Sequence, residues 1–297
     1  MIFALKRAGN ELMAIKVGTT IGMLNPKYFL PVAIAADRLG FESLWMPEHL
    51  VLPQKMAGSP FSTEKSESGH PSLPPETALF DVFGYLAFLA GQTTQIRLGT
   101  NVYLLGLRHP FVAARAIQTL DWVSNGRAEI GVGAGWLRSE WTAAGMDPKT
   151  RGRRLDEALG VCKRLWSEET IAHDGEFYQF EQVKFEPKPL QRPHPPIHIG
   201  GESVAALRRV ARHGDGWYGI GHTLETIHPV LAKLRDIVRA EGRDPDQLEI
   251  ITTAEVSSRD ELKRWEDLGV TRLVVCPWRR GSEAIVGLER FAAEILH

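Results

Sequence analysis

Glu48 and His49 place a carboxylate beside an imidazole directly after the short apolar run Ser43–Met46. Such a pair can donate or accept a proton near neutral pH, which is what general acid–base chemistry requires. If the apolar run is a strand of an α/β barrel, both side chains lie at its carboxyl end, where such barrels carry their active sites. The alternative is that Glu48 pairs with a nearby arginine and that His49 only bonds to the backbone. We predict that both residues are catalytic.

A glycine-rich run follows the apolar segment 128–132 and leads into a helical pattern. Gly131, Gly133 and Gly135 alternate in this run before Trp136. Glycines at such a junction let a ligand approach the backbone, and the helix that follows offers unpaired N–H groups to an anion. The spacing also matches a dinucleotide-binding fingerprint, but weakly, because the acidic residues at the expected distance lie in a helical pattern. A barrel loop around a phosphate or a ring edge explains the run better.

A second junction of this kind lies at residues 196–203. The apolar run ends in Gly200 and Gly201, and Glu202 then precedes Ser203, a typical helix N-cap. We expect a second anion-binding site here, although barrel phosphate sites more often follow the last two strands. Two such junctions on one chain favour a phosphate-bearing cofactor that is held at strand ends.

Thr100 and Asn101 interrupt the apolar run 96–103 with polar side chains, where a buried strand is normally aliphatic. This departure indicates a bulge or a strained peptide that presents its backbone to a ligand. A simple kink at the end of the strand is the alternative. We include both residues in the predicted ligand site.

Short apolar runs alternate with longer amphipathic segments along the chain, as strands and helices do in α/β folds. Eight consecutive units with buried strands predict a single (β/α)₈ TIM barrel. The predicted strands are 15–22, 43–46, 96–103, 128–132, 196–199, 216–220, 248–256 and 272–276. The predicted helices are 27–39, 79–91, 110–123, 137–144, 153–166, 203–212, 224–241, 260–268 and 283–296.

Two segments depart from this alternation. Residues 47–78, rich in Pro, Ser and Gly, form an insertion after the second strand that is long enough to be a lid or a binding loop. Residues 171–190 predict a β-hairpin inserted before the fifth strand. Because the first convincing strand starts near Ile15, we predict an N-terminal extension over 1–14 and a barrel domain over 15–297.

The composition argues against several classes of function. The net charge is -1 and the basic residues are scattered, which gives little support for binding to nucleic acid or to an anionic membrane. No apolar run reaches the roughly 18 residues that a membrane-spanning helix needs. The only two cysteines, Cys162 and Cys276, stand in apolar settings, which fits a reducing cytoplasm. No group of residues has metal-ligand spacing, so we expect no metal.

The chain resembles the luciferase-like monooxygenase superfamily of flavin-dependent barrels. The likeness is carried by the stretches 36–49 (ADRLGFESLWMPEH), 108–136 (ending in LDWVSNGRAEIGVGAGW) and 192–217 (beginning RPHPPIHIGG). The pattern is most similar to the actinobacterial branch that uses coenzyme F420, a 5-deazaflavin that transfers hydride and reacts poorly with oxygen. The resemblance therefore implies coenzyme F420 as the cofactor, with FMN as the alternative.

The same resemblance implies roles for the residues described above. Glu48 and His49 would lie near the reactive ring. The stretch Thr100–Asn101 would form a bulge behind the ring, which in this superfamily is often a non-prolyl cis peptide. The residues that would hold the ribityl chain and the phosphate are Gly133, Gly135, Trp136, Gly200, Gly201, Glu202 and Ser203.

The implied activity is hydride transfer between coenzyme F420 and a small organic substrate. The alternative is an FMNH₂-dependent monooxygenase that uses O₂ and a separate flavin reductase. A protein that only stores or carries a flavin is a third possibility from another class. Relatives commonly dimerise, so we expect a homodimer, for which the apolar helix 80–90 could supply the contact surface. The sequence does not name the substrate.

Overall fold

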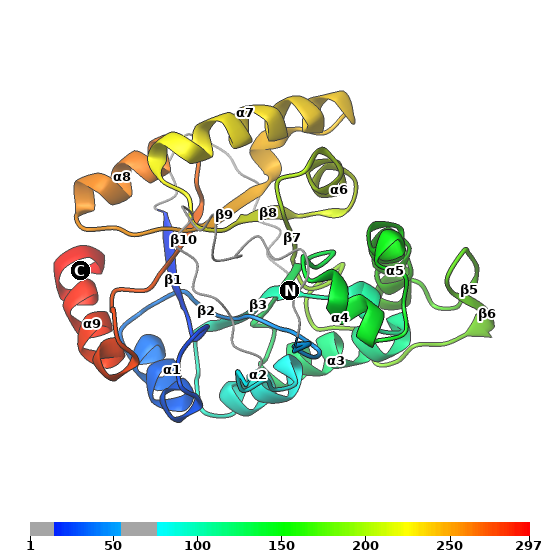
Figure 1. Cartoon of the computed structure of the whole chain (residues 1–297), viewed down its shortest axis with the longest axis horizontal. Coiled ribbons are helices and arrows are strands. Elements are labelled where there is room, and N and C mark those ends of the chain that lie inside the picture. The colour runs from blue at the N-terminus through cyan, green and yellow to red at the C-terminus, as the bar shows by residue number, and fades with distance from the viewer. Residues whose placement is uncertain (1–14, 55–75) are drawn as a thin grey trace, which may run out of the picture.

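Eight parallel strands close into a barrel with the order β1-β10-β9-β8-β7-β4-β3-β2. A computed structural model describes residues 15–54 and 76–297 (Figure 1). The barrel strands are β1 Lys16–Thr20, β2 Ser43–Met46, β3 Arg97–Tyr103, β4 Ala128–Val132, β7 Ile197–Gly200, β8 Gly216–Gly219, β9 Glu249–Thr253 and β10 Arg272–Val275. The predicted (β/α)₈ barrel is confirmed.

Helices surround the barrel on its outer side (Figure 1). They are α1 Phe29–Arg38, α2 Val82–Ala90, α3 Pro110–Val123, α4 Arg138–Ala143, α5 Arg151–Ser167, α6 Val204–His213, α7 Leu224–Ala240, α8 Arg259–Asp267 and α9 Ala284–Phe291. Each predicted strand and helix is present, with ends that shift by a few residues. The first strand, predicted over 15–22, ends at Thr20 because the backbone turns away after that residue.

The hairpin predicted within 171–190 is confirmed as β5 (Ile171–Asp174) and β6 (Gln179–Val183), which pair antiparallel outside the barrel. It extends from the molecule beside α5, at the right of Figure 1. A carboxylate of α5, Glu157, anchors it by accepting hydrogen bonds from the backbone of Phe177 and Tyr178. Most of the predicted 47–78 insertion, and the predicted extension 1–14, lie outside the described residues.

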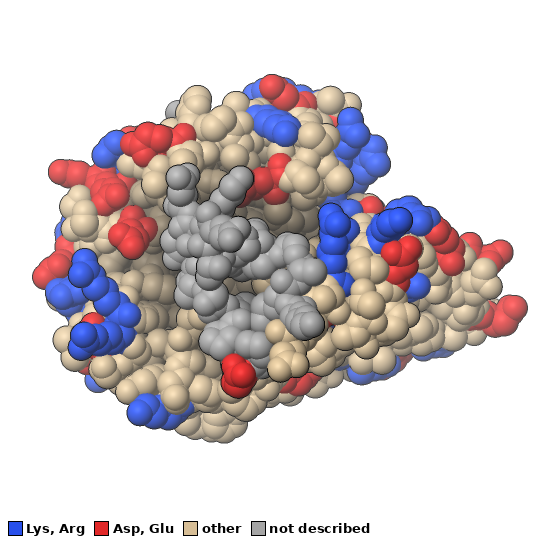
Figure 2. All heavy atoms as spheres, in the orientation of Figure 1, with Lys and Arg blue, Asp and Glu red and all other residues tan. Residues whose placement is uncertain are grey.

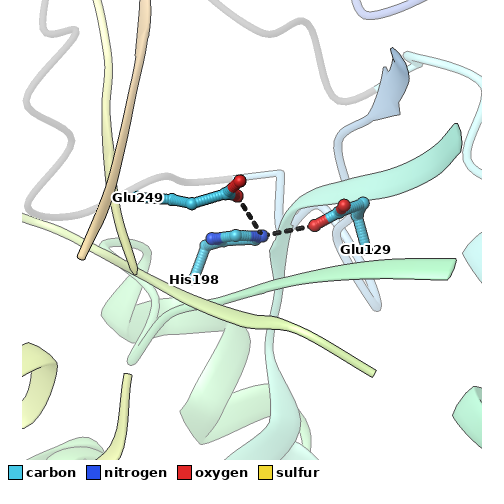
Figure 3. Close-up of side chains that lie close together, drawn as sticks. All are labelled: Glu129, His198 and Glu249. Carbon is cyan, nitrogen blue, oxygen red and sulfur yellow. Dashed lines mark hydrogen bonds and ion pairs between the residues drawn. The ribbon is translucent and has the colours of Figure 1, made fainter. Parts of the chain in front are cut away.

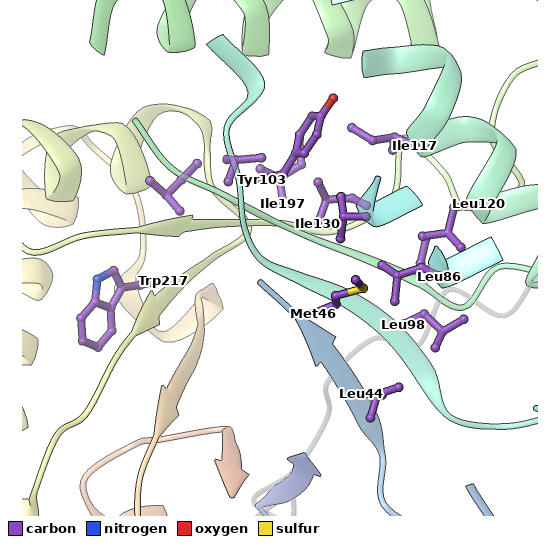
Figure 4. Packing of buried hydrophobic residues seen from close by; sticks show 14 of the residues in the cluster. Leu44, Met46, Leu86, Leu98, Tyr103, Ile117, Leu120, Ile130, Ile197 and Trp217 are labelled. Atoms are coloured by element: carbon purple, nitrogen blue, oxygen red, sulfur yellow. The ribbon is translucent and has the colours of Figure 1, made fainter. Parts of the chain in front are cut away.

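The apolar core lies between the outer faces of the strands and the helices. Figure 4 shows Leu44 of β2 and Leu98 of β3 near Leu86 of α2 and Leu120 of α3, all fully buried. A separate cluster lies inside the barrel and consists of Trp45, Tyr218, Ile251 and Val274, one from each of β2, β8, β9 and β10. Alternate residues of a strand point to opposite faces, so each of these four strands contributes to both clusters.

Trp45 occupies the barrel interior because a glycine on the next strand gives it room. A Cβ added at Gly99 of β3 would overlap the indole ring of Trp45. The indole Nε1 donates a hydrogen bond to Ser43 Oγ at 2.9 Å, and its ring contacts that of Tyr218 with centroids 5.0 Å apart. The middle of the barrel is therefore filled by side chains, and only its two ends can carry chemistry.

The surface in Figure 2 carries intermixed acidic and basic side chains. Within the described parts of the chain, no helix is both long enough and apolar enough to span a bilayer. Cys162 is buried, Cys276 is exposed, and the two form no disulfide.

Candidate active site

His49 is held at the carboxyl end of β2 by a carboxylate from another part of the barrel. Its Nδ1 lies 2.9 Å from Oε2 of Glu140, a residue of α4. Glu140 is fully buried, and its second oxygen accepts hydrogen bonds from the backbone N–H groups of Leu50 at 2.5 Å and Val51 at 3.4 Å. Glu140 thus fixes both the imidazole ring and the chain that follows it.

Trp136 completes this arrangement. Its ring meets the His49 ring edge to face, with centroids 5.5 Å apart and an interplanar angle of 85°. Trp136 lies between β4 and α4, so the segment after β4 contributes both an aromatic wall and the Glu140 carboxylate. The structure therefore brings two predicted site residues, His49 and Trp136, into contact.

Glu48 points to a different set of neighbours. Its buried carboxylate accepts a hydrogen bond from the backbone N–H of Leu104 at 2.8 Å and forms an ion pair with Arg108. The Arg108 guanidinium also lies over the ring of Tyr103, 4.7 Å from its centroid. The arginine pair considered above for Glu48 is therefore present, and it ties the segment after β2 to the segment after β3.

Burial raises the pKa of Glu48, and the attraction of Arg108 and the bond from Leu104 offset this only in part. Such a carboxyl group takes up a proton more readily than an exposed one. The catalytic role predicted for Glu48 stays a prediction.

The end of β3 carries the predicted bulge. The register between β3 and β4 shifts between Thr100 and Tyr103, and a cis peptide joins Asn101 to Val102. This bond lies one position after the stretch Thr100–Asn101. Thr100 is fully buried, and its hydroxyl donates to the carbonyl of Gly131 at 2.7 Å.

Asn101 presents an unused acceptor at this end of the barrel. Its Nδ2 donates to the hydroxyl oxygen of Tyr218 at 3.3 Å, while its Oδ1 is buried and has no hydrogen-bond partner among the described residues. Buried polar atoms normally have partners, so this atom is a candidate acceptor for a bound ligand.

Glycines in β4, directly after β4 and in β7 leave space for the β3 bulge. A Cβ at Gly131 would overlap the carbonyl of Thr100, and a Cβ at Gly133 would lie 2.5 Å from Cγ2 of Val102. Gly200 of β7 faces the same side chain, at 2.9 Å from Val102 Cγ1. The protein itself therefore requires glycine at these positions, and their contact with a cofactor stays a prediction.

Replacing Gly131 with alanine should lower the free energy of unfolding by about 3 kcal/mol, the upper end of the range for overpacking, because the new methyl group meets a backbone carbonyl that cannot rotate away. Gly160 in the interior of α5 is a suitable control, since a Cβ there has no neighbour within 4 Å. Gly160→Ala should stabilise the protein by up to about 1 kcal/mol. Urea unfolding compares the two variants, and equal unfolding midpoints would contradict the steric argument.

The second glycine junction is built as an N-terminal helix cap. Ser203 accepts a hydrogen bond from the backbone of Ala206 at 3.1 Å and caps α6, as predicted. Gly201 has a φ of 105°, which side-chain-bearing residues rarely adopt. Its carbonyl accepts a hydrogen bond from Trp217 Nε1 at 2.9 Å. Because β4 and β7 are neighbours in the barrel, the two glycine junctions lie at adjacent strand ends.

Glu202 has a partner that the sequence did not reveal. Its Oε1 lies 3.1 Å from Nε2 of His222, a buried residue after β8. The His222 imidazole beside it holds the pKa of the Glu202 carboxyl below its ordinary value. Glu202 is about half exposed, so this pair is open to solvent on one side.

A buried charged network lies at the other end of the barrel. Figure 3 shows His198 of β7 between Glu129 of β4 and Glu249 of β9, with Nε2 at 2.5 Å and 3.8 Å from their carboxylate oxygens. These are first or second residues of their strands, so the network faces the amino ends of the strands. It is therefore separate from the His49 site.

The three residues of this network are close enough to hold a metal ion, with ligand atoms within 4.8 Å of one another. Arg272 already supplies a cation there, because its Nη2 lies 3.2 Å from Glu129 and its Nη1 lies 3.5 Å from Glu249. A metal ion would have to displace or repel this buried guanidinium. We interpret the network as an ion-pair cluster that closes the bottom of the barrel.

Comparison with known proteins agrees with this architecture. The family model described as luciferase-like monooxygenase matches residues 1–274, and the chain belongs to this family. An uncharacterised protein of Mycobacterium tuberculosis is 35% identical over 272 residues, which cover 89% of this chain and 93% of that protein. The chain is therefore an oxidoreductase of the luciferase-like class, as its sequence motifs predicted.

Relatives with assigned activities use two different cofactors. An F420-dependent glucose-6-phosphate dehydrogenase of Kineococcus radiotolerans is 32% identical over 226 residues, which cover 73% of this chain and 60% of that protein. An FMNH₂-dependent dimethylsulfone monooxygenase of Pseudomonas putida is 34% identical over 136 residues, 45% of this chain and 38% of that protein.

The fold has a close counterpart among solved structures. An F420-dependent secondary alcohol dehydrogenase, in complex with an F420-acetone adduct, superposes with a TM-score of 0.76 at 16% sequence identity, over 96% of this chain and 99% of that one. At this level of identity the likeness establishes the barrel fold alone.

Proposed function

We propose that this chain is a coenzyme F420-dependent oxidoreductase that transfers hydride between the deazaflavin and a small organic substrate. The observation that carries the proposal is the pair of His49 and the buried Glu140 at the carboxyl end of the barrel, in a chain of the luciferase-like family. Hydride transfer to or from a polar double bond leaves a proton to be moved, and an imidazole at the strand end can move it. The similarity to an F420-dependent dehydrogenase over 73% of this chain supports the choice of cofactor.

The residues at this end of the barrel fit such a cofactor. The orphaned Oδ1 of Asn101 can accept a hydrogen bond from a ring N–H, and the first turn of α6 after Ser203 suits a phosphate. We propose that the cofactor is bound by Thr100, Asn101, Gly133, Gly135, Trp136, Gly200, Gly201, Glu202 and Ser203.

The residues of the chain provide orientation and proton transfer, while the bound deazaflavin supplies the carbon that gives or takes the hydride. His49 exchanges a proton with the substrate, and Trp136 limits how its ring can turn. Glu48, held by Arg108 and the Leu104 N–H, sets the position of the neighbouring His49 and adds a carboxyl group of raised pKa beside it.

An FMNH₂-dependent monooxygenase that uses O₂ and a separate flavin reductase is the alternative, supported by the similarity to the dimethylsulfone monooxygenase. The same proton-transfer group would serve that chemistry. The fold does not discriminate between the two, because one barrel can host both.

Separate binding titrations with coenzyme F420 and with FMN, followed by cofactor fluorescence, test the proposal. We expect tight binding of the deazaflavin and weak binding of FMN. Tight binding of FMN alone, with oxygen-dependent loss of substrate, would establish the monooxygenase. Binding of neither would overturn the cofactor assignment, and binding without turnover of any alcohol, aldehyde or activated alkene would favour a flavin carrier.

We further propose that two chains associate through α2 and α3, which pack against each other. Large apolar side chains on these helices and just before them are exposed: Phe80 (40%), Phe88 (49%), Val112 (61%), Trp122 (46%) and Val123 (53%). Light scattering should give the mass of a dimer for the native chain and of a monomer for Phe88→Glu, since an interface does not accept an unpaired charge. Val286→Glu on α9, at a position more exposed in the native chain than Phe88, should leave the dimer intact. A monomeric native chain would overturn this proposal.

A further inference from the structure

The atoms around His49 determine which ring nitrogen carries its proton. An ionised carboxylate only accepts hydrogen bonds, and Glu140 Oε1 accepts them from Leu50 and Val51. The other oxygen, Oε2, lies 2.9 Å from Nδ1 of His49, so Nδ1 must donate the proton in that bond. In the neutral ring the lone pair is then on Nε2.

We infer that Glu140 is a positioning residue that keeps the proton of neutral His49 on Nδ1 and so leaves Nε2 as the atom that exchanges a proton with the substrate. The inference rests on the proposed function, in which His49 is the proton-transfer group. Glu140 touches neither substrate nor cofactor in this role and acts only through His49. Glu140 also accepts a hydrogen bond from the backbone of Leu50, so it joins α4 to the segment after β2 and holds both the His49 ring and the chain that carries it.

The negative charge of Glu140 contributes to raising the pKa of Glu48, and Glu48 itself is paired with Arg108. Among these three groups, Glu140 is the one whose side chain contacts the His49 ring in the described residues. A carboxylate that accepts a hydrogen bond from Nδ1 orients the ring as well as fixing its tautomer.

The chain contains the same arrangement away from the site. Glu157 of α5 accepts hydrogen bonds from the backbone of Phe177 and Tyr178, and its Oε1 lies 3.1 Å from Nε2 of His173. There the carboxylate holds the β5–β6 hairpin and no strand end is involved. Glu157→Gln is therefore a matched control, because it removes the same charge and the same kind of contacts without touching His49.

Glu140→Gln is the sharpest test, because the amide cannot reproduce both functions of the carboxylate. The N–H groups of Leu50 and Val51 require an oxygen, so the amide oxygen must face them and the NH₂ group must face His49. When the NH₂ group of the glutamine donates a hydrogen bond to Nδ1, that nitrogen must carry the lone pair. The ring proton then lies on Nε2. The variant should therefore hold His49 in the opposite tautomer.

Nitrogen-15 NMR of histidine-labelled protein, with no cofactor or substrate added, reads the tautomer directly. We expect the native chain and Glu157→Gln to carry the His49 proton on Nδ1, and Glu140→Gln to carry it on Nε2. His49→Gln assigns the resonance. A native ring protonated on Nε2, or an unchanged tautomer in Glu140→Gln, would overturn the inference, and neither result depends on the proposed activity.

Turnover with coenzyme F420 provides the second readout. Glu140→Gln should lower kcat by about 10²-fold with little change in KM. Glu140→Asp, which keeps an acceptor-only group, should recover part of the rate, and covers the case in which the glutamine variant fails to fold. Equal rates in Glu140→Gln and Glu157→Gln would overturn the positioning role. Native protein without turnover, but with the expected tautomers, would contradict only the proposed function.

Discussion

Replacing His49 with alanine should reduce turnover by about 10²- to 10⁴-fold, the range for loss of a general acid–base group. The loss should appear in kcat, while the dissociation constant of the cofactor stays within about twofold of the native value. The reason is geometric. His49 is not among the proposed cofactor contacts, which lie at the ends of β3, β4 and β7, and of these Trp136 meets its ring edge to face.

The matched control for this prediction is His173→Ala. His173 also pairs with a glutamate, but it lies on the hairpin outside the barrel. This variant should keep native turnover. Single-turnover oxidation of reduced coenzyme F420 by the best substrate of a carbonyl and alkene panel measures both variants. Native turnover in His49→Ala would remove His49 from the mechanism and leave the carrier function as the better account.

Much of this site could be predicted from the sequence because its residues stand at strand ends that are themselves easy to locate. Buried parallel strands appear as short apolar runs, so Glu48, His49 and the polar break at Thr100–Asn101 could be placed at the carboxyl end of the barrel. The Ser203 cap could be predicted for a similar reason, since its residue type and its place before a helix define its role.

Glu140 could not be found in this way. It is 91 positions from His49 in the chain, and a glutamate in a helical run normally faces solvent. The signal that was present is local: Glu140 follows the glycine-rich junction by five residues, in the loop and short helix after β4, and this segment lies at the same end of the barrel as His49. The His222 partner of Glu202 was missed, and the arginine considered for Glu48 could not be identified as Arg108, because ion pairs depend on tertiary contacts.

The glycines illustrate a different limit of sequence analysis. Their alternate spacing predicted a backbone open to a ligand, and the structure adds that Val102 from the β3 bulge occupies the place where a side chain at Gly133 or Gly200 would lie. A glycine pattern indicates that another group approaches the backbone closely. The sequence does not say whether that group belongs to a ligand or to the protein itself. The bulge at the end of β3 packs directly against these glycines, so the polar residues that interrupt β3 require small residues in or next to β4 and β7.

Replacing Arg272 with methionine should lower the free energy of unfolding by about 3–5 kcal/mol at pH 7, the usual cost of removing one partner from a buried ion pair. Arg272 is almost fully buried and pairs with Glu42, Glu129 and Glu249 at the amino ends of the strands. The exposed pair of Arg212 and Glu241 is the control, and Arg212→Met should cost no more than about 1 kcal/mol.

The pH dependence of the free energy of unfolding distinguishes whether Arg272→Met acts through lost ion pairing or through lost packing. Burial by itself would raise the pKa of Glu129, but the attraction of Arg272, with help from His198 and Arg97, holds that pKa well below its ordinary value. A carboxyl with a depressed folded-state pKa adds stability above its unfolded pKa of about 4.5, and that stability is lost as the pH falls through the folded value. The native protein should therefore lose stability below about pH 4.5.

Arg272→Met should show a weaker loss on acidification. Without the guanidinium, burial acts against the ionised form of Glu129, and the folded-state pKa of its carboxyl moves upward. Protonation then relieves part of the cost of the buried charge, so the stability gap between the native protein and the variant should narrow as the pH falls from 7 to 4. Urea unfolding across this range measures the gap. A gap that stays constant would mean that Arg272 stabilises the barrel by packing over Trp45, whose ring centroid lies 5.7 Å from its guanidinium carbon, and not by compensating Glu129.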